Sequence, residues 1–358
     1  MKAWQLTRLG GDLRLVDLPR PEPRPGSVVV RMKMSAVMSY MSSYVAGELP
    51  VYHAPGQPFI PGGNGVGIVH AVGKDVWHLK PGQRVVISSH FMANENVKDP
   101  AQMLIGVTAA GAEAHAMQAD WPDGTLAEYA LLPASTLTAA DGAADLDAQQ
   151  LALSTRFVVP FGGLLRGRLA VGETVAVSGA TGAYGCAAAL LAVAMGAGRV
   201  VAVGRNAQAL EVLAEAGDGR IVPVAVTGNV TYDAAAIRDA ARGHVDLAFD
   251  MVGNANDPGM TLAALRSLGR EGRLVLMGSM AVDLPVPYTE IMLNGWEIIG
   301  QFMYPRDAYR RLLSLAGTRA LNFGALRPVT FSMAQLETAI DRAARASGLE
   351  CVLINHEE

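Results

Sequence analysis

The chain has 358 residues, more than a single hydrophobic core usually supports, so we expect two domains. Hydrophobic residues make up 51% and charged residues 17% of the sequence, which excludes an intrinsically disordered chain. The formal net charge of −4, with acidic and basic residues interspersed, argues against a nucleic-acid partner.

The first part of the chain consists of short alternating apolar stretches broken by glycine and proline, for example residues 27–32 and 65–70. This pattern predicts a β-rich, barrel-like domain. From about Leu151 apolar strands alternate with Ala/Leu-rich helices, which is typical of a doubly wound parallel sheet. Its predicted strands are 174–178, 200–203, 220–224, 245–250, 273–277 and 297–301, and its predicted helices are 183–195, 207–216, 234–241, 260–268 and 305–315.

A further helix at 335–346 and a strand at 351–354 are assigned to the first domain. The predicted fold class is therefore α/β, with one domain formed by residues 1–150 and 303–358 and the other by residues 151–302. No pattern predicts how residues 90–120 fold.

The start of the chain, its two cysteines and its longest uncharged stretch bear on cellular location and membrane insertion. The first residues alternate like a strand and lack the apolar run of a signal peptide, and neither Cys186 nor Cys351 stands in a paired motif. Residues 174–198 are uncharged and long enough in principle to cross a bilayer. The glycines clustered within them favour a buried strand, a tight loop and a buried helix instead. We therefore expect a cytoplasmic protein with no membrane segment.

The most informative stretch is the glycine-rich turn after the strand expected at 174–178. Gly182 can let the backbone approach a diphosphate, and Gly185 can let the helix pack closely on the strand. The helix N-terminus offers free N–H groups to the negative charge. Ala180 replaces the first glycine of the common G-x-G-x-x-G string, but Gly179 can still make the turn. The pattern predicts dinucleotide binding, and a purely structural glycine turn is the alternative. The residues of this loop are Gly179, Ala180, Thr181, Gly182, Ala183, Tyr184 and Gly185.

About twenty residues past the glycines, NAD-binding domains place an Asp or Glu that binds the ribose 2′-hydroxyl. This chain has Gly204, Arg205 and Asn206 there. Because no carboxylate repels a phosphate and Arg205 can bind one, NADP(H) is the predicted cofactor. The alternative is that Arg205 only caps a solvated helix start.

Three segments resemble medium-chain zinc alcohol dehydrogenases: residues 61–73 (PGGNGVGIVHAVG), 79–86 (LKPGQRVV) and 123–130 (DGTLAEYA). The resemblance spans nearly the whole chain and points to the medium-chain dehydrogenase/reductase superfamily. It implies a GroES-like β-barrel that carries the substrate site, a Rossmann domain and a cleft between them. It also implies a homodimer that pairs through the last Rossmann strand, near residues 296–302.

In this family the nicotinamide runs along the ends of the later strands, where open α/β sheets bind their ligands. The small residues in these segments could admit the ribose and ring, although each segment could also be only a glycine-terminated strand. The residues implied are Met251, Val252, Gly253, Gly278, Ser279 and Met280.

The chain departs from the family at the catalytic metal. Met38, Gly63 and Asn64 stand where zinc enzymes have a cysteine, a histidine and a glutamate. A lone thioether with an amide is too weak and too soft a ligand set for Zn²⁺, so no metal is predicted. The four-cysteine lobe for structural zinc is missing as well, because residues 90–120 contain no cysteine. The resemblance is therefore to a zinc-free quinone oxidoreductase or alcohol dehydrogenase-like member.

Without a metal, hydrogen-bond donors must stabilise the negative charge that develops on the substrate. Tyr40 aligns where zinc-type relatives keep a proton-relaying Ser or Thr, and a phenol can donate to an enolate or alkoxide. Its alternative role is packing within a methionine-rich stretch. Asn64 could donate to a substrate carbonyl. Tyr44 and Tyr52 could line the mouth of the same substrate site.

Two functions from different classes follow. The first is an NADPH-dependent reductase of a small molecule: a quinone, an α,β-unsaturated carbonyl, or an aldehyde or ketone. The second is a nucleotide-binding sensor or structural protein without turnover, because one fold can host unrelated functions. A zinc alcohol dehydrogenase with unusual ligands is a third.

Overall fold

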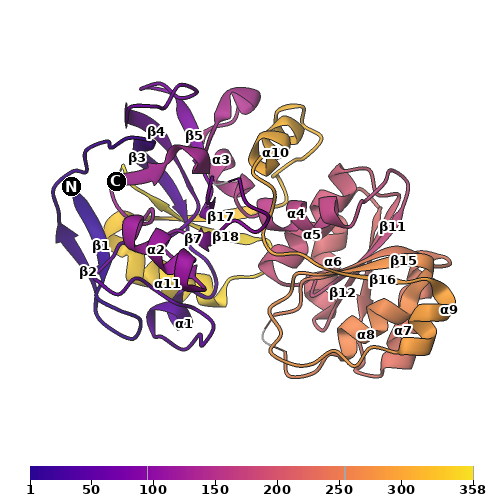
Figure 1. The fold of residues 1–358 in the computed structure, drawn as a ribbon. Coiled ribbons are helices and arrows are strands. Elements are labelled where there is room, and N and C mark those ends of the chain that lie inside the picture. The colour runs from indigo at the N-terminus through magenta and orange to yellow at the C-terminus, as the bar shows by residue number, and fades with distance from the viewer. Residues whose placement is uncertain (95, 254, 358) are drawn as a thin grey trace.

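The computed structural model describes residues 1–94, 96–253 and 255–357. The chain forms two lobes, and both of its ends lie in the lobe that holds the first strands (Figure 1). Among the described residues, no helix combines the length and the apolar character that crossing a membrane requires.

The first lobe is built on a curved sheet with the strand order β10-β5-β4-β3-β18-β17, in which β9 also pairs with β3. A separate hairpin, β1–β2, forms its own two-stranded sheet. Because β18 pairs antiparallel with β3, the last strand of the chain is hydrogen-bonded into the sheet that begins near its start. The strands are β1 (Lys2–Leu6), β2 (Leu13–Asp17), β3 (Ser27–Ala36), β4 (Gly65–Val72), β5 (Arg84–Ile87), β9 (Tyr129–Pro133), β10 (Leu137–Ala139), β17 (Arg327–Ser332) and β18 (Glu350–Asn355).

The alternation of β3 explains how this lobe is filled. Val28, Val30 and Met32 point to the same side of the strand, since successive side chains alternate, and they enter one buried cluster. The cluster also contains Val85 and Ile87 of the strand β5. The interior of the lobe is therefore a packed core of side chains from several strands.

Residues 90–120, whose fold no sequence pattern predicts, form a small unit of their own. It has three short antiparallel strands, β6 (His90–Met92), β7 (Gln102–Leu104) and β8 (Thr108–Ala109), followed by the helix α2 (Ala112–Asp120). Met103 and Ile105 of this unit are buried in the core of the first lobe. Two other helices of this lobe are α1 (Met41–Val45) and α11 (Leu336–Arg345).

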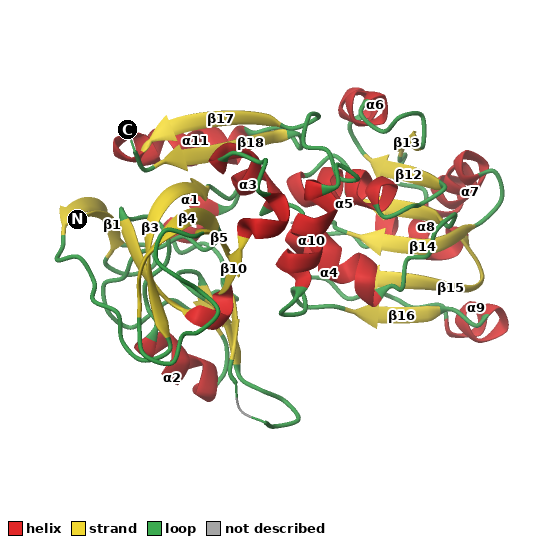
Figure 2. Cartoon of the chain, turned by 90° about the horizontal axis from the view of Figure 1, so that it is seen from above, coloured by secondary structure: helices red, strands yellow, loops and turns green. Residues whose placement is uncertain are grey.

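The second lobe contains a six-stranded, all-parallel sheet in the order β13-β12-β11-β14-β15-β16 (Figure 2). Counted within the lobe this is the 3-2-1-4-5-6 order of the Rossmann fold. The α/β fold class, with a β-rich first domain and a Rossmann second domain, is confirmed. The strands are β11 (Thr174–Ser178), β12 (Arg199–Gly204), β13 (Ile221–Ala225), β14 (Val245–Asp250), β15 (Leu268–Leu276) and β16 (Glu297–Gly300), and the helices are α5 (Ala183–Ala194), α6 (Ala207–Glu215), α7 (Val230–Ala241), α8 (Gly259–Ser267) and α9 (Tyr288–Asn294).

Both faces of this parallel sheet are buried, which is why its strands are continuously apolar. Val175 and Val177 of β11 pack in the cluster that also contains residues of α5 and α6. Ala176, between them, points to the opposite face and packs with residues of α7 and α8. Three more helices, α3 (Ala148–Ser154), α4 (Val158–Arg166) and α10 (Ala308–Gly317), lie between the two lobes (Figure 2).

The predicted strands and helices of the second lobe are present, with shifts at their ends. The largest shift is in β15, which begins at Leu268 and not at residue 273. Its first residue pairs with Val245, and after an irregularity the regular ladder resumes with Leu247 opposite Arg273. The helix predicted at 260–268 therefore ends one residue earlier, at Ser267.

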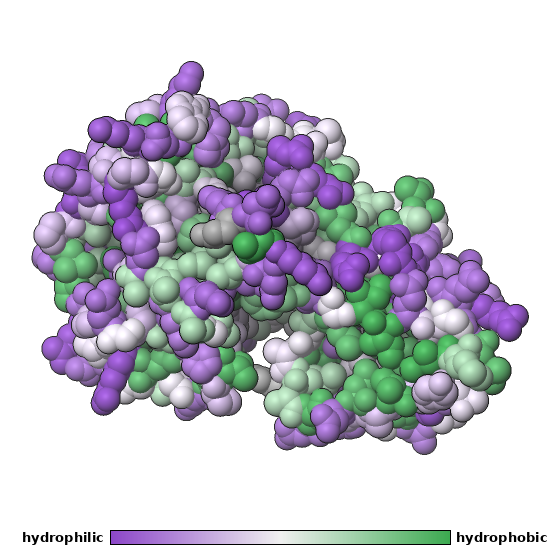
Figure 3. Space-filling model, in the orientation of Figure 1, coloured by the Kyte–Doolittle hydropathy of each residue, from purple (hydrophilic) through white to green (hydrophobic). Residues whose placement is uncertain are grey.

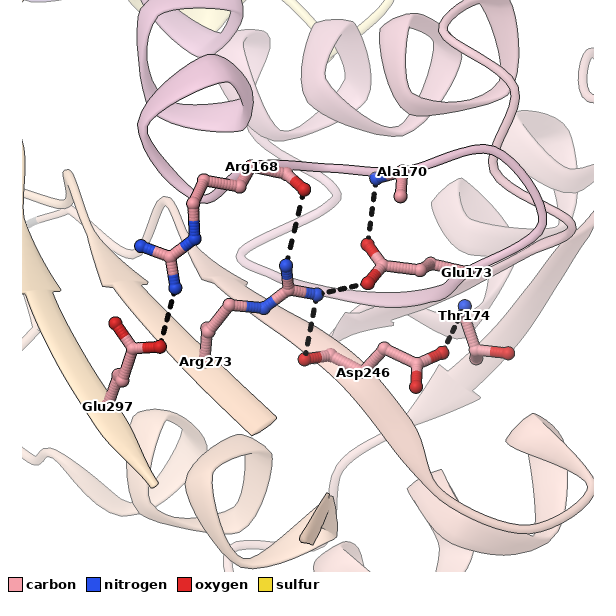
Figure 4. A network of polar contacts seen from close by, with 7 residues as sticks. All are labelled: Arg168, Ala170, Glu173, Thr174, Asp246, Arg273 and Glu297. Atoms are coloured by element: carbon pink, nitrogen blue, oxygen red, sulfur yellow. Dashed lines mark hydrogen bonds and ion pairs between the residues drawn. The ribbon is translucent and has the colours of Figure 1, made fainter. Parts of the chain in front are cut away.

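A network of polar contacts joins the amino ends of several strands of the Rossmann sheet (Figure 4). Arg273 of β15 forms an ion pair with Glu173 and donates to the backbone carbonyl of Arg168. The Arg168 side chain in turn pairs with Glu297 at the start of β16. Asp246 of β14 accepts a hydrogen bond from the Thr174 backbone N–H at 2.8 Å. These contacts tie the α4–β11 connection to β14, β15 and β16.

Candidate functional site

The glycine loop lies at the carboxyl end of β11. The polar network lies at the amino ends of the strands, on the opposite side of the sheet. Gly179 has a φ of +72°, a left-handed conformation that glycine adopts without strain. The Ala180 N–H donates to the Val203 carbonyl at 3.0 Å, which fixes the loop to β12. A Cβ at position 185 would lie 2.1 Å from the Gly179 carbonyl oxygen, so only glycine lets α5 pack this closely. A Cβ at position 182 would make only an ordinary contact, at 3.4 Å.

The N-terminus of α5 differs from those of the next two helices. Asn206 caps α6 by accepting from the Ala209 N–H, and Asn229 caps α7 in the same way. The N-cap residue of α5 is Gly182, which has no side chain to cap with. The first N–H groups of α5 thus remain available to an anion, as a diphosphate site requires.

The residues predicted to select the cofactor lie beside this loop. A Cβ at Gly204 would lie 2.9 Å from the Thr181 methyl carbon, so the end of β12 abuts the loop directly. Arg205 is exposed and has no hydrogen-bond or ion-pair partner in the described part of the chain. Asn206, and not Arg205, provides the helix cap, with its Oδ1 accepting from Ala209 N–H at 3.1 Å.

The first predicted nicotinamide segment contacts the end of β11 at the glycine loop, and the second segment pairs with the first. The Met251 N–H donates to the Ser178 carbonyl at 3.1 Å, and the Ser279 N–H donates to the Val252 carbonyl at 3.0 Å. A Cβ at Gly278 would lie 2.2 Å from the Val252 carbonyl oxygen, so these segments pack without room for a side chain there. Gly253 forms a parallel bridge with Ser279, and Met280 follows in the same loop.

A hollow between the lobes joins the loop to the predicted catalytic residues. It encloses about 530 Å³, including the part open to solvent. Ala183 and Tyr184 of α5 line it on one side, and Met38, Tyr40 and Asn64 line it on the other. The remaining lining residues come from the α3–α4 region and from the segment that contains β18: Ala152, Leu153, Thr155, Arg156, Cys351, Val352 and Leu353, together with Ala36, Val37 and Ser39 next to Met38.

The orientation of the Asn64 amide is set by its backbone neighbour. The Ser89 N–H donates to Asn64 Oδ1 at 2.9 Å, and only the oxygen of the amide can accept it. The Nδ2 group therefore faces away from Ser89 and has no acceptor in the described part of the chain. Asn64 is buried, so this N–H donor is held in a fixed position at the wall of the hollow.

Tyr40 is half-buried, and its hydroxyl donates to the Met38 sulfur at 2.8 Å. Burial raises the pKa of Tyr40 well above its ordinary value, and the nearby hydroxyls of Tyr184 and Tyr52 raise it further. The phenol therefore remains protonated at physiological pH. It can donate a hydrogen bond to a developing enolate or alkoxide.

The two other tyrosines proposed for the mouth do not line the hollow. Tyr44 is buried in the core, where its hydroxyl donates to the Val107 carbonyl at 2.7 Å. Tyr52 packs against the Tyr40 ring, with ring centroids 5.7 Å apart. Sequence reasoning missed Thr155 and Arg156, which no motif marks. Arg156 is, however, the one charged residue in the apolar run 151–165, and that was an available signal.

At the positions of the family's catalytic zinc ligands, this chain offers few donor atoms and little space for a larger side chain. A Cβ at Gly63 would lie 2.7 Å from the Ser89 Cβ, so no side chain fits there unless Ser89 moves. Asn64 Oδ1 already accepts a hydrogen bond, and Met38 offers only a thioether. Elsewhere in the described residues, no group of three or more His, Cys, Asp or Glu side chains is placed to hold a metal ion.

Two family models match the chain. The alcohol dehydrogenase GroES-like domain matches residues 24–141, and the zinc-binding dehydrogenase domain matches residues 183–318. An alcohol dehydrogenase of Moraxella sp. (strain TAE123) is 29% identical over 317 residues, covering 88% of each chain. Quinone oxidoreductase-like protein 2 of Mus musculus is 28% identical over 296 residues, covering 78% of this chain and 69% of that protein. The crystal structure of a short-chain alcohol dehydrogenase from E. coli CFT073 in complex with NADH aligns with a TM-score of 0.82 at 19% identity, covering 99% of each chain.

These matches define the chain as an oxidoreductase of a class that uses a nicotinamide dinucleotide. Both family models fall within this class, and they match the two lobes in the order expected from the sequence. The chain belongs to the medium-chain dehydrogenase/reductase superfamily, among proteins related to alcohol dehydrogenases and quinone oxidoreductases. The family resemblance stated from the sequence is thus confirmed.

Proposed function

We propose that this protein is a zinc-independent, NADP(H)-dependent reductase of a quinone, an α,β-unsaturated carbonyl, or an aldehyde or ketone. The observation that supports it most strongly is the single hollow lined both by the N-terminal residues of α5 and by the fixed amide of Asn64. A dinucleotide bound at the loop and a carbonyl bound at Asn64 would meet in that hollow.

The preference for NADP(H) rests on charge at the end of β12. Arg205 is exposed beside the loop and pairs with no carboxylate among the described residues, so its guanidinium is available to a 2′-phosphate. Asn206 can add only its Nδ2 group, because its oxygen caps α6. No acidic side chain stands at residues 204–206 to bind a ribose 2′-hydroxyl or to repel a phosphate.

Zinc independence rests on the ligand set. Residues 38, 63 and 64 supply a thioether, no side chain and a neutral amide whose oxygen is turned to the Ser89 N–H, and such a set does not fit Zn²⁺. Substrate activation is therefore assigned to hydrogen bonds. Activated acceptors, which need less polarisation, suit this arrangement best.

The chain's own residues would act on the substrate as donors. A bound nicotinamide supplies the hydride chemistry. Asn64 Nδ2 would donate to the substrate oxygen, in an orientation set by the Ser89 N–H, and the neutral Tyr40 hydroxyl would leave the Met38 sulfur to make a second hydrogen bond. The raised pKa of Tyr40 keeps its hydroxyl protonated, so the same group is also the proposed donor of the proton.

The cofactor assignment is tested by titrating the purified protein with NADPH and with NADH in a calorimeter. We expect NADPH to bind at least about tenfold more tightly, because a charged hydrogen bond contributes about 1.5–3 kcal/mol. Arg205→Asp should reverse the preference, whereas Arg8→Asp, the same charge change in the other lobe, should leave it unchanged. Equal affinities for the two nucleotides in the wild type would overturn the NADP(H) assignment.

Turnover is tested by following NADPH oxidation with a panel of quinones, enones and aldehydes. We expect activity with at least one class, activity retained after chelation, and a kcat reduced at least about tenfold in Asn64→Ala. Nucleotide binding without turnover of any acceptor would favour a sensor or structural protein. Bound stoichiometric zinc whose removal abolishes turnover would overturn the metal-free assignment.

Assembly as a homodimer is also proposed. The strand β16 is an edge of the Rossmann sheet, and α9 beside it has no buried residue. Exposed apolar side chains gather on this lobe, which shows a wide hydrophobic area in Figure 3. They include Tyr288, Met292 and Leu293 of α9 and Phe302 after β16. An edge strand beside exposed apolar side chains is suited to pairing with a second copy.

A further inference from the structure

Arg156 is the only charged side chain among the described residues that line the hollow. It lies in the short connection between α3 and α4, next to Thr155, and is half-buried. Sequence motifs gave it no role, and it lies outside the glycine loop and the metal positions. A cation at the wall of an otherwise uncharged cleft needs an electrostatic explanation.

The position of the Arg156 guanidinium is fixed relative to the glycine loop. Its Nη1 donates to the Gly348 carbonyl at 2.8 Å. Gly348 packs directly on the loop, since a Cβ there would lie 2.4 Å from Cys186 Sγ and 2.5 Å from the Thr181 carbonyl oxygen. Gly348 therefore tethers the guanidinium beside the N-terminus of α5.

The charge of Arg156 is not neutralised within the described protein. No carboxylate lies within ion-pair distance of it, and Nη1 makes its only hydrogen bond, so other N–H groups of the fork remain. Its influence reaches α5. Burial raises the pKa of the Cys186 thiol to about 12, and the positive charge of Arg156 opposes this rise. Arg156 and the uncapped N-terminus of α5 therefore present positive potential to the same part of the cleft.

We propose that Arg156 is a diphosphate-binding residue, whose guanidinium donates to the phosphate oxygens of the dinucleotide beside the N–H groups of α5. This assignment rests on the proposed function, because it requires a dinucleotide at the glycine loop. A planar guanidinium donating to phosphate oxygens is a strong, charge-assisted contact. It differs from the role of Arg205, which concerns only the 2′-phosphate. Arg156 thus sets affinity for both nucleotides, and Arg205 sets the choice between them.

The experiment compares Arg156→Met, Arg156→Lys and the control Arg166→Met with the wild type. Arg166 is exposed on α4 and does not line the hollow. We expect Arg156→Met to weaken NADPH and NADH binding by the same factor, about 10- to 100-fold, with Arg156→Lys intermediate. Adenosine 2′-monophosphate, which carries the 2′-phosphate but no diphosphate, should bind Arg156→Met as it binds the wild type. Arg166→Met should bind all three ligands unchanged.

Thermal unfolding without nucleotide checks that Arg156→Met is folded, since it loses the contact with Gly348. If folded Arg156→Met binds both nucleotides as tightly as the wild type, the assignment is wrong. Unchanged nucleotide affinity with a raised KM only for acceptors that bear a carboxylate would assign Arg156 to the substrate and would likewise overturn it. A wild-type protein that binds neither nucleotide would refute the proposed function itself, which is a distinct result.

Discussion

At Asn64, a single backbone contact decides which chemistry the side chain can offer. With its Oδ1 turned to the Ser89 N–H, the amide presents its Nδ2 donors to the hollow. The neighbouring Gly63 has no space for the side chain that a metal site requires. These two adjacent residues are the basis for the proposal that the site acts through hydrogen bonds and not through a metal.

Asp250, the last residue of β14, is buried beside the segment that leads into the cofactor cleft. The Thr261 hydroxyl donates to its Oδ1 at 2.8 Å. Burial raises the pKa of Asp250 from 3.8 to about 6, although the hydrogen bonds from Thr261 and from the Val252 backbone oppose this rise. The folded state therefore holds this proton more tightly than the unfolded state does.

The sign of the resulting pH dependence is fixed. The stabilising contribution of the protonated group is fully present below 3.8 and is lost as the pH rises through about 6. The loss is at most about 3 kcal/mol in the free energy of unfolding. Asp250→Asn should therefore gain stability relative to the wild type as the pH is raised from about 4 to about 7. Chemical denaturation of both proteins across this range measures the difference.

The comparison with a variant is needed because His356 acts in the opposite direction. Burial lowers the pKa of His356 to about 4, so its contribution is lost as the pH falls. The two groups partly cancel in the wild-type curve. A difference between Asp250→Asn and the wild type that does not change with pH would contradict the raised pKa of Asp250.

On the scale of elements, two glycines at the start of α5 have different roles. Gly185 allows close packing of the helix, and Gly182 leaves room for a ligand. Gly185→Ala should destabilise the protein by more than about 2 kcal/mol, because its Cβ would overlap the Gly179 carbonyl. Gly182→Ala should unfold at nearly the wild-type temperature, because its Cβ makes only a 3.4 Å contact. It should nevertheless weaken NADPH binding, since the methyl group would stand where a diphosphate approaches.

Calorimetric titration and thermal unfolding of the two variants check this pair. Gly56→Ala is the matched control, because a Cβ there meets no atom within 4 Å. If Gly182→Ala binds NADPH as the wild type does, the diphosphate does not approach the backbone at this position.

The Rossmann elements were predictable because each strand carries its own signal. Val175 to Val177 are apolar without interruption, as in a sheet covered on both faces, and the prediction of β11 agrees with the structure at both ends. The glycine spacing also predicted the loop and the start of α5. A positive φ and close packing require glycine at particular positions, and the sequence displays those glycines directly. These features are local, and the sequence alone displays them.

The rest of the site depends on contacts between distant segments. Arg156 reaches the loop only through Gly348, which lies 192 residues further along the chain. The amide orientation of Asn64 depends on Ser89, the residue directly before the small unit at 90–120, for which no periodic pattern exists. Tyr44 was misjudged as a residue of the mouth because its hydroxyl partner, Val107, also belongs to that unit. Tertiary contacts decide these roles, and single-sequence patterns do not encode them.

On the scale of the whole molecule, the exposed apolar side chains of α9 and the edge strand β16 predict self-association. Leu293 is 61% exposed, although it is an apolar residue on a short helix. Leu293→Asp should convert a dimer into a monomer in sedimentation velocity, because a buried, unpaired carboxylate opposes the interface. Trp77→Asp, which changes an apolar residue 82% exposed on the other lobe, should remain dimeric.

A wild-type protein that sediments as a monomer at micromolar concentration would contradict this prediction. A dimer that persists in Leu293→Asp would instead place the interface elsewhere on the surface. The domain boundaries and the cytoplasmic location remain predictions from the sequence.

The polar network around Arg273 and the glycine loop occupy opposite rims of one rigid sheet. The network anchors strand beginnings, whereas the nucleotide rests on strand endings. Substitutions around Arg273 are therefore expected to change the stability of the fold at a distance from the nucleotide. At the glycine loop the same residues serve packing and binding, so stability and nucleotide affinity are coupled there.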